Sequence, residues 1–247
     1  MIRRHLTLAT ALAAVLAGAA PAVAAPAPVH APLIRTSPHP DETGLTHGTS
    51  SNWSGYAATG HQFTSVSASW IQPTAHCTAQ DTWSSFWVGL DGDGSNSVEQ
   101  TGSEVDCSSG RPQYYSWYEM YPAYPVNYND PVDAGDHFTA SVTAGTRGSF
   151  TLVLSDTTKG WSHTVHRTLR NARLASAEVV AEAPSTLAGP LPLTDFGTVG
   201  FTAATADGHP LGSFAPEQIT MARGGTTLVT VSPLTGGTDF TAAWQHS

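Results

Sequence analysis

Short strand-like runs, each closed by turn-forming residues, are the feature that most constrains the fold of this chain. From about residue 51 onward the runs are separated by Gly, Pro, Asn and Asp. We expect strands at residues 63–71, 84–90, 97–101, 113–121, 137–143, 149–154, 162–168, 177–182, 198–203, 226–231 and 239–244. The turns at 156–160 and 223–225 predict hairpins. About a dozen closely spaced strands indicate an all-β sandwich or barrel of antiparallel sheets. Only residues 166–176 have some helical composition.

Composition excludes several classes of protein. Hydrophobic residues make up 40% of the chain and charged residues only 12%, with seven Trp, seven Tyr and eight Phe. Disorder requires the opposite balance, so we expect a packed core. The formal net charge is −9 and Lys159 is the only lysine. A chain this acidic repels phosphate backbones, so no nucleic-acid partner is expected.

The N-terminus has the three parts of a secretory signal. Arg3 and Arg4 precede an apolar run at residues 6–20, and small residues follow at 22–24. A membrane anchor would need a longer apolar span. We therefore assign residues 1–25 to a signal peptide and predict a secreted, extracellular protein whose mature form has no membrane segment.

Two further segments follow the signal. Residues 26–48 are rich in Pro, Ala, Thr and His without apolar periodicity, which indicates a flexible leader or short pro-segment. Residues 49–247 form the expected β domain, and nothing in them demands more than a monomer.

The chain has two cysteines, Cys77 and Cys107. In an exported protein a single pair is most simply a disulfide. The alternative, a catalytic Cys77 thiolate, has His76 beside it but no further support. We predict the disulfide.

Common catalytic signatures are absent. The sequence has no Gly-x-Ser-x-Gly, His-Glu-x-x-His, Gly-rich phosphate loop or Cys-x-x-Cys. The loop at residues 91–96 resembles the start of a calcium loop, but it lacks the Gly and Glu expected at positions six and twelve. We therefore expect no metal and no cofactor.

Acidic and amide side chains lie within apolar, aromatic strands. Strand alternation places Glu119 on one face with Tyr115 and Trp117, and places Gln100 opposite Glu99. A carboxylate in an aromatic wall is a common feature of peptide and sugar clefts; the alternative is an edge strand with a chance acid.

A second acidic face occurs in the strand at 177–182. Glu178, Val180 and Glu182 share this face. An acid in apolar surroundings has a raised pKa and can act as a general base in weakly acidic solution. The alternative is a solvated face.

Five motifs together resemble the glutamic peptidases, also called eqolisins. In chain order they are Trp87-Val88-Gly89-Leu90-Asp91-Gly92-Asp93, Glu99-Gln100-Thr101-Gly102, Trp117-Tyr118-Glu119-Met120-Tyr121-Pro122, Ala177-Glu178-Val179-Val180-Ala181-Glu182 and Asp195-Phe196-Gly197-Thr198-Val199. The resemblance covers nearly the whole chain from about residue 52, and five separated motifs in register are a specific signal.

The resemblance implies a concanavalin A-like sandwich of two antiparallel β-sheets with a cleft on the concave face. It also implies an acid-active endopeptidase that acts on protein or peptide substrates without metal or cofactor. The catalytic Gln and Glu of the family fall on Gln100 and Glu182. Its supporting residues fall on Trp87, Asp91 and Glu119.

The implied chemistry is coherent. Glu182 as a carboxylate can take a proton from the attacking water and return it to the leaving amine. The Gln100 amide can donate to the developing oxyanion. Since the base must be ionised at low pH, we expect hydrogen bonds to prevent a large rise in the pKa of Glu182.

Two other functions remain open from the residues. A carbohydrate-active enzyme could use Glu119 and Glu182 as its carboxylate pair. A lectin-like or structural module could use the aromatic strand as a binding platform, and would need neither Gln100 nor Glu182.

Overall fold

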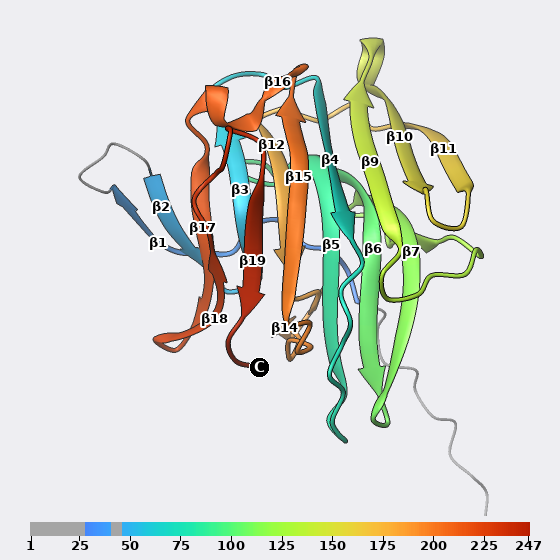
Figure 1. The fold of residues 1–247 in the computed structure, drawn as a ribbon. Helices are drawn as coiled ribbons and strands as arrows, with labels where there is room; N and C mark the ends of the chain where they lie inside the picture. Colours follow the sequence, from blue (N-terminus) through green and yellow to red (C-terminus); the bar gives the residue numbers. More distant parts are fainter. Residues whose placement is uncertain (1–27, 41–45) are drawn as a thin grey trace, which may run out of the picture.

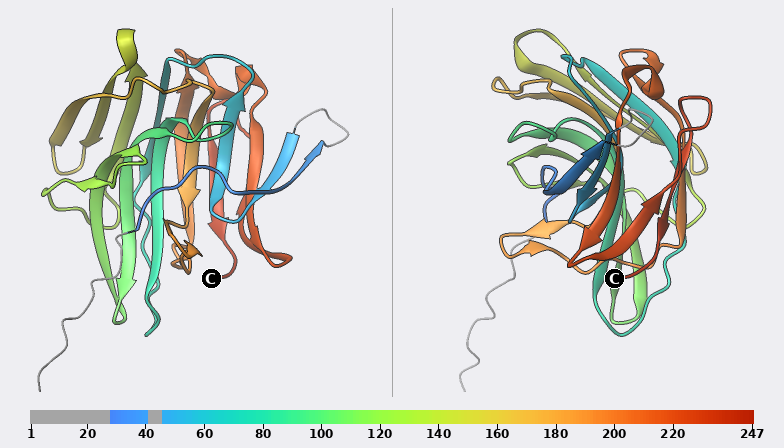
Figure 2. Two further views of the ribbon diagram at one scale, coloured as in Figure 1. Left: turned by 180° about the vertical axis from the view of Figure 1, so that it is seen from behind. Right: turned by 90° about the vertical axis from the view of Figure 1, so that its left-hand side faces the viewer.

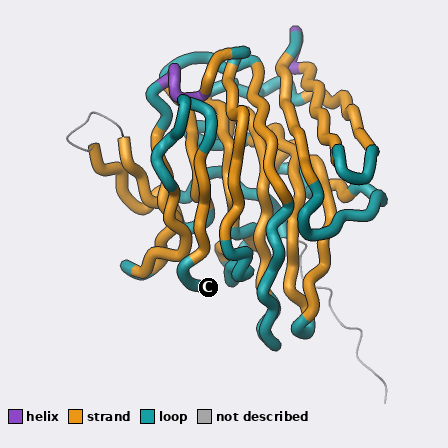
Figure 3. Tube along the Cα trace, in the orientation of Figure 1, coloured by secondary structure: helices purple, strands orange, loops and turns teal. Residues whose placement is uncertain are grey.

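The computed structural model describes residues 28–40 and 46–247, so the expected signal segment lies outside the described residues. Nearly all of the regular structure is β (Figures 1 and 3), and the helical segments of the described part are two short 3-10 turns, η1 (Thr146–Gly148) and η2 (Leu211–Phe214). No helix in this part of the chain has the length and apolar character needed to cross a membrane.

The strands form two packed layers. The first layer, here called the site sheet, has the order β8-β7-β6-β5-β12-β3-β17. Its strands are β8 (Val126–Asn127), β7 (Arg111–Tyr121), β6 (Val98–Ser108), β5 (Thr82–Asp91), β12 (Ser176–Glu182), β3 (Trp53–Thr59) and β17 (Glu217–Arg223). All of these neighbours pair antiparallel.

The second layer, the outer sheet, has the order β11-β10-β9-β4-β15-β19-β18. Its strands are β11 (Trp161–Thr168), β10 (Ser149–Asp156), β9 (His137–Ala144), β4 (Ser65–Ile71), β15 (Thr198–Ala206), β19 (Phe240–Trp244) and β18 (Thr226–Val231). Because β18 also pairs with β17, the two sheets are joined along one edge. The layers are seen edge-on in the right panel of Figure 2.

Short strands complete the fold. They are β1 (Arg35–Pro40) and β2 (Thr46–Ser50), which pair with each other, β16 (His209–Pro210) beside β15, and the separate pair β13 (Ser185–Thr186) and β14 (Gly189–Pro190). The strand β2 runs parallel to β17 and carries the chain from the leader into the site sheet.

The all-β sandwich predicted from the sequence is confirmed, and each of the eleven expected strands is present. Both expected hairpins form, as β10–β11 and β17–β18. Residues 166–176 contain the end of β11 and a loop rather than a helix. The strand β6 extends to Ser108, well beyond the expected 97–101, because its small and polar residues hide the apolar alternation. The strand β3 was not predicted, because it is buried on both faces and so does not alternate.

Alternation along β5 separates two apolar clusters. Phe86, Val88 and Leu90 point into the main core between the sheets. Trp87 lies on the opposite face, in a smaller cluster with Trp117 and other side chains. The site sheet is therefore buried on both faces, and its second face carries the polar groups described below.

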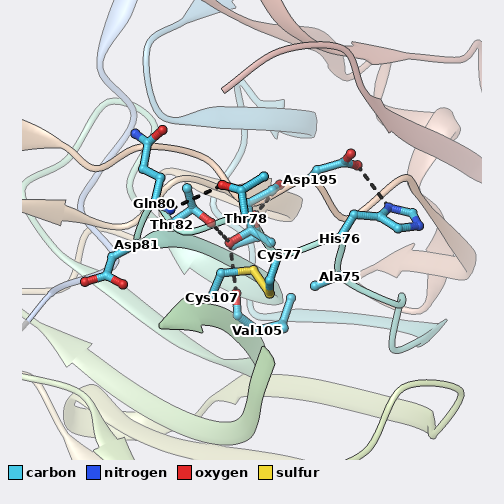
Figure 4. The surroundings of a disulfide bond; sticks show 12 residues. Ala75, His76, Cys77, Thr78, Gln80, Asp81, Thr82, Val105, Cys107 and Asp195 are labelled. Carbon is cyan, nitrogen blue, oxygen red and sulfur yellow. Dashed lines mark hydrogen bonds and ion pairs between the residues drawn. A yellow bond between two sulfur atoms is a disulfide. The ribbon is translucent and has the colours of Figure 1, made fainter. Parts of the chain in front are cut away.

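The predicted disulfide between Cys77 and Cys107 is confirmed (Figure 4). It joins the loop before β5 to the end of β6, with the two Cα atoms 5.3 Å apart. The described residues contain no free cysteine, so the alternative of a catalytic thiolate is wrong.

Candidate active site

Strand register places the candidate residues on one face of the site sheet. Across β12, β5, β6 and β7, three rows of paired residues are Glu178–Gly89–Gln100–Glu119, Val180–Trp87–Gly102–Trp117 and Glu182–Ser85–Glu104–Tyr115. Directly paired residues point to the same face of a sheet. The face therefore presents Gln100 and Glu119 in one row and Glu182 two rows away.

The acids on this face are buried, not solvated. Glu178, Glu182 and Glu119 have no exposed surface, and β12 is buried along its whole length. The interpretation of the Glu178–Glu182 face as a solvated surface is therefore wrong. Glu119 lies on a strand paired on both sides over part of its length, with β6 and with β8, so it is not a chance acid on a free edge.

The Glu182 carboxylate has two side-chain donors. The Nε1 of Trp87 donates to Oε2 of Glu182 at 2.8 Å, and the Nδ2 of Asn52 donates to Oε1 at 3.4 Å. Burial nevertheless raises the pKa of Glu182 well above its usual range, and the charge of Glu119 adds to this rise. The expectation that hydrogen bonds prevent a large rise in this pKa is corrected here, because desolvation outweighs them.

Gly89 makes room for the Trp87 ring. A Cβ atom at position 89 would lie 2.9 Å from the Cζ3 atom of Trp87. The ring therefore lies along β5 over Gly89, while its Nε1 edge faces the row of Glu182. A side chain at position 89 would push the ring and weaken its hydrogen bond to the carboxylate.

On the expectation from the sequence motifs that Glu182 is the catalytic base, replacing Trp87 by Phe should move the acid side of the pH–activity profile to higher pH. The hydrogen bond from Trp87 favours the ionised form of Glu182, so its loss raises the pKa of that carboxyl further. A hydrogen bond to a charged group contributes about 1.5–3 kcal/mol, so activity below the midpoint should fall roughly tenfold or more. The measurement is kcat/KM against pH. The matched control is Trp161→Phe, whose Nε1 bonds to the Pro131 carbonyl; an equal shift in both variants would contradict the assignment.

Asp91 supports the backbone that leads into β12. Its carboxylate accepts hydrogen bonds from the N–H groups of Arg173, Leu174 and Ala175 at 2.8–2.9 Å. These residues directly precede Ser176, the first residue of the strand that carries Glu182. Asp91 therefore helps to position Glu182 by fixing the backbone that leads into β12.

The Gln100 amide is held by Glu119. Its Nε2 donates to Oε2 of Glu119 at 3.1 Å and to the backbone carbonyl oxygen of His30 at 2.8 Å. Burial raises the pKa of Glu119, while the contacts with His30 oppose this rise. Glu119 thus orients the amide that contacts a peptide carbonyl.

The leader crosses this face as an extended segment (Figure 2, left panel). Val29 exchanges backbone hydrogen bonds with Ser185 on one side, and Leu33 donates to Gly92 on the other. Trp53 Nε1 donates to the Ala31 carbonyl at 3.0 Å. Residues 29–33 are therefore held through their backbone, as an extended peptide is held in a cleft.

An ion pair anchors the other end of this segment. The Arg35 guanidinium contacts Glu217 Oε1 at 2.6 Å and also bonds to Asp93. Its two partners lie in β17 and just after β5. The leader is thus fixed to the site sheet on both sides of His30 and Ala31.

Several site residues were not identified from the sequence: His30, Asn52, Trp53 and Glu104. Strand alternation could have found Glu104, since positions 100, 102 and 104 share a face. His30 had no local signal, because its partners lie 70 to 89 residues away.

A hollow of about 820 Å³ lies elsewhere, on the outer sheet around β4, β9 and β15. Its lining includes Trp70, His137 and Phe138 but no carboxylate. The buried carboxyl groups of Glu119 and Glu182 lie on the site-sheet face instead, so that face is the candidate site.

Comparison with known proteins agrees with this geometry. The sequence profile of the Peptidase A4 family matches residues 51–244, most of the chain. The chain therefore belongs to the peptidase A4 family, the glutamic peptidases, and the family resemblance seen in the motifs is confirmed. This membership favours the peptidase over the carbohydrate-active alternative.

Individual similar proteins belong to the same class of peptidase. Scytalidopepsin B of Scytalidium lignicola is 33% identical over 112 residues, which span 44% of this chain and 42% of that protein. The fold is similar to scytalido-glutamic peptidase bound to a transition state analog inhibitor, with a TM-score of 0.68 and 25% identity over 79% of this chain and 98% of that one. Aspergilloglutamic peptidase from Aspergillus niger gives a TM-score of 0.59 and 26% identity over 66% and 99% of the two chains.

Proposed function

We propose that this protein is a secreted, acid-active glutamic endopeptidase in which Glu182 is the general base and Gln100 stabilises the oxyanion. The observation that carries the proposal is the hydrogen bond from Gln100 Nε2 to the carbonyl of an extended peptide segment lying across the face that contains Glu182. The family membership supports peptide bonds as the target, and a peptide-based transition state analog has been bound to scytalido-glutamic peptidase.

The proposed reaction uses groups that the site sheet brings to one face. Glu182, once ionised, takes a proton from water as the water attacks the carbonyl carbon. The Gln100 amide, fixed by Glu119, donates to the oxygen that becomes negative. Glu182 then returns the proton to the leaving amine. Asn52 and Trp53 hold the next carbonyl along the chain, which fixes the direction of the bound peptide.

The path of the described leader residues across the site sheet supports a role as a pro-segment. Residues 29–33 accept hydrogen bonds from the side-chain amides of Gln100 and Asn52, the same donors that a substrate would need. We propose that residues 26–48 are a pro-segment that leaves this face before substrates bind, after residues 1–25 have directed export. Removal of the leader would expose the site to water, and easier hydration of the Glu182 carboxylate lowers its pKa. It would also withdraw the charge of His30, which acts on this pKa in the opposite direction, so the hydration effect must be the larger of the two.

Digestion of a denatured protein between pH 2 and pH 7 tests the function. We expect cleavage on the acid side that resists both a chelator and pepstatin, because the proposed mechanism uses neither a metal nor an aspartic dyad. The Gln100→Glu variant should lose this activity, since it places a second acid where an amide donor is needed. Absence of cleavage by a folded sample at every pH, with the leader either intact or lost, would contradict the proposal.

A further inference from the structure

The side chain of His30 is buried on the face of the site sheet formed by β6 and β7. Its Nε2 lies 2.8 Å from Glu104 Oε2, and its Nδ1 lies 3.0 Å from Glu119 Oε2. The ring stacks on Trp117, with centroids 3.6 Å apart and planes within 6°. Only 2% of the His30 surface is exposed.

Both nitrogens of this ring face carboxylate oxygens. An ionised carboxylate only accepts hydrogen bonds, so each ring nitrogen must carry a proton. The bound ring is therefore an imidazolium, and its charge is balanced by the two acids. Burial alone would lower the pKa of His30, but the charges and hydrogen bonds of Glu104 and Glu119 outweigh it and raise the pKa to about 10.

Other ionisable groups face this ring. Asp106 and Tyr115 lie next to Glu104, with the Tyr115 hydroxyl donating to Asp106 at 2.9 Å. On β12, the charge of His30 lowers the pKa of Glu182, against the larger effect of burial. Burial and the neighbouring Glu104 raise the pKa of Asp106 to about 9, so in weak acid it holds its proton. The carboxyl group that directly contacts Nε2 is that of Glu104, at 2.8 Å.

The backbone of His30 is held in the same place as its side chain. Its N–H donates to Glu119 Oε2 at 3.0 Å, and its carbonyl accepts from Gln100 at 2.8 Å. In the proposed mechanism, the carbonyl held by Gln100 is the one that water attacks. The residue in the pocket is therefore the one immediately before the bond to be cleaved.

We propose that the pocket formed by Glu104, Glu119 and Trp117 selects a protonated histidine side chain on the residue whose carbonyl is held by Gln100, both in the leader and in substrates. This inference rests on the proposed peptidase function. Two acceptors at opposite edges of a ring, with an indole against its face, match an imidazolium. Phe would leave both buried acids without donors, and the single ammonium of Lys cannot reproduce the planar stack.

The first test measures the protonation of the histidine in the pocket and does not depend on catalysis. Histidine-selective NMR is recorded on the full chain carrying Glu182→Gln, which prevents self-cleavage. At pH 8.5 we expect one imidazole that keeps both N–H protons; its signal should vanish in His30→Ala and remain in the control His246→Ala. The proposal is overturned if every histidine has lost a proton at this pH, or if the signal persists in His30→Ala.

The second test measures substrate preference. The full-chain His30→Ala variant, whose own leader no longer fills the pocket, is given peptides that differ at one residue: His, Phe, Leu, Lys or Ala. At pH 5, where a free imidazole is protonated, we expect kcat/KM for the His peptide to exceed that for Phe at least tenfold, with cleavage immediately after His. Adding Glu104→Gln should reduce this ratio to about threefold or less.

The outcomes are distinguishable. Equal rates for the His and Phe peptides, or an unchanged ratio with Glu104→Gln, would overturn the specificity pocket while leaving a peptidase. No cleavage of any peptide would overturn the proposed function, and the NMR result would still decide whether the pocket holds an imidazolium.

Discussion

Glu182→Gln is expected to reduce kcat for peptide hydrolysis by roughly 10²–10⁴-fold, the range typical for loss of a general base. The amide keeps the shape of the carboxyl group and can still contact Trp87 and Asn52, but it cannot take a proton from water. The measurement is single-turnover cleavage of a fluorogenic peptide in weak acid. Circular dichroism and the thermal midpoint show whether the variant is folded.

Glu178→Gln is the matched control for this variant. Glu178 lies on the same strand and face, is equally buried, and its pKa is also raised well above the usual range by burial. The amide keeps the shape of the side chain, and Glu178 takes no part in the proposed proton transfer, so activity should change less than threefold. A large loss in Glu178→Gln with little loss in Glu182→Gln would reverse the assignment of the base.

The parts of the site that lie within single strands could be predicted from the sequence. Strand alternation and the family motifs identified Gln100, Glu119 and Glu182, and the register brings all three to one face. This succeeded because the period-two pattern and the motif spacing are local properties of β6, β7 and β12. The same alternation assigned Glu99 to the opposite face from Gln100.

The occupant of the site could not be predicted in this way. The leader has no apolar periodicity, so nothing local shows that His30 would contact Glu119, 89 residues further along the chain. The path becomes apparent only when Ser185, Gly92 and the Arg35 ion pairs are seen to hold the segment from both sides. The pKa of Glu182 was misjudged for a related reason, because counting donors does not measure burial.

Removing the disulfide is expected to lower the free energy of unfolding by roughly 3–4 kcal/mol, the value that loop-closure entropy gives for a loop of about 30 residues. The bond between Cys77 and Cys107 has a sequence separation of 30. The enclosed segment includes all of β5 and most of β6, and therefore both Trp87 and Gln100. Without the cross-link this segment gains conformational freedom in the unfolded chain, while its native pairing with β12 and β7 remains available.

Urea unfolding of the double variant Cys77→Ala/Cys107→Ala measures this effect, with wild type under reducing conditions as the comparison. The two samples should agree within about 1 kcal/mol, since both lack the bond. Below the unfolding transition the double variant should keep most of its peptidase activity, because the disulfide contacts none of the groups around Gln100 or Glu182. A loss of stability below about 1 kcal/mol would show that the unfolded chain already holds this segment together. A folded but inactive double variant would instead show that the cross-link sets the position of Gln100 in the native sheet.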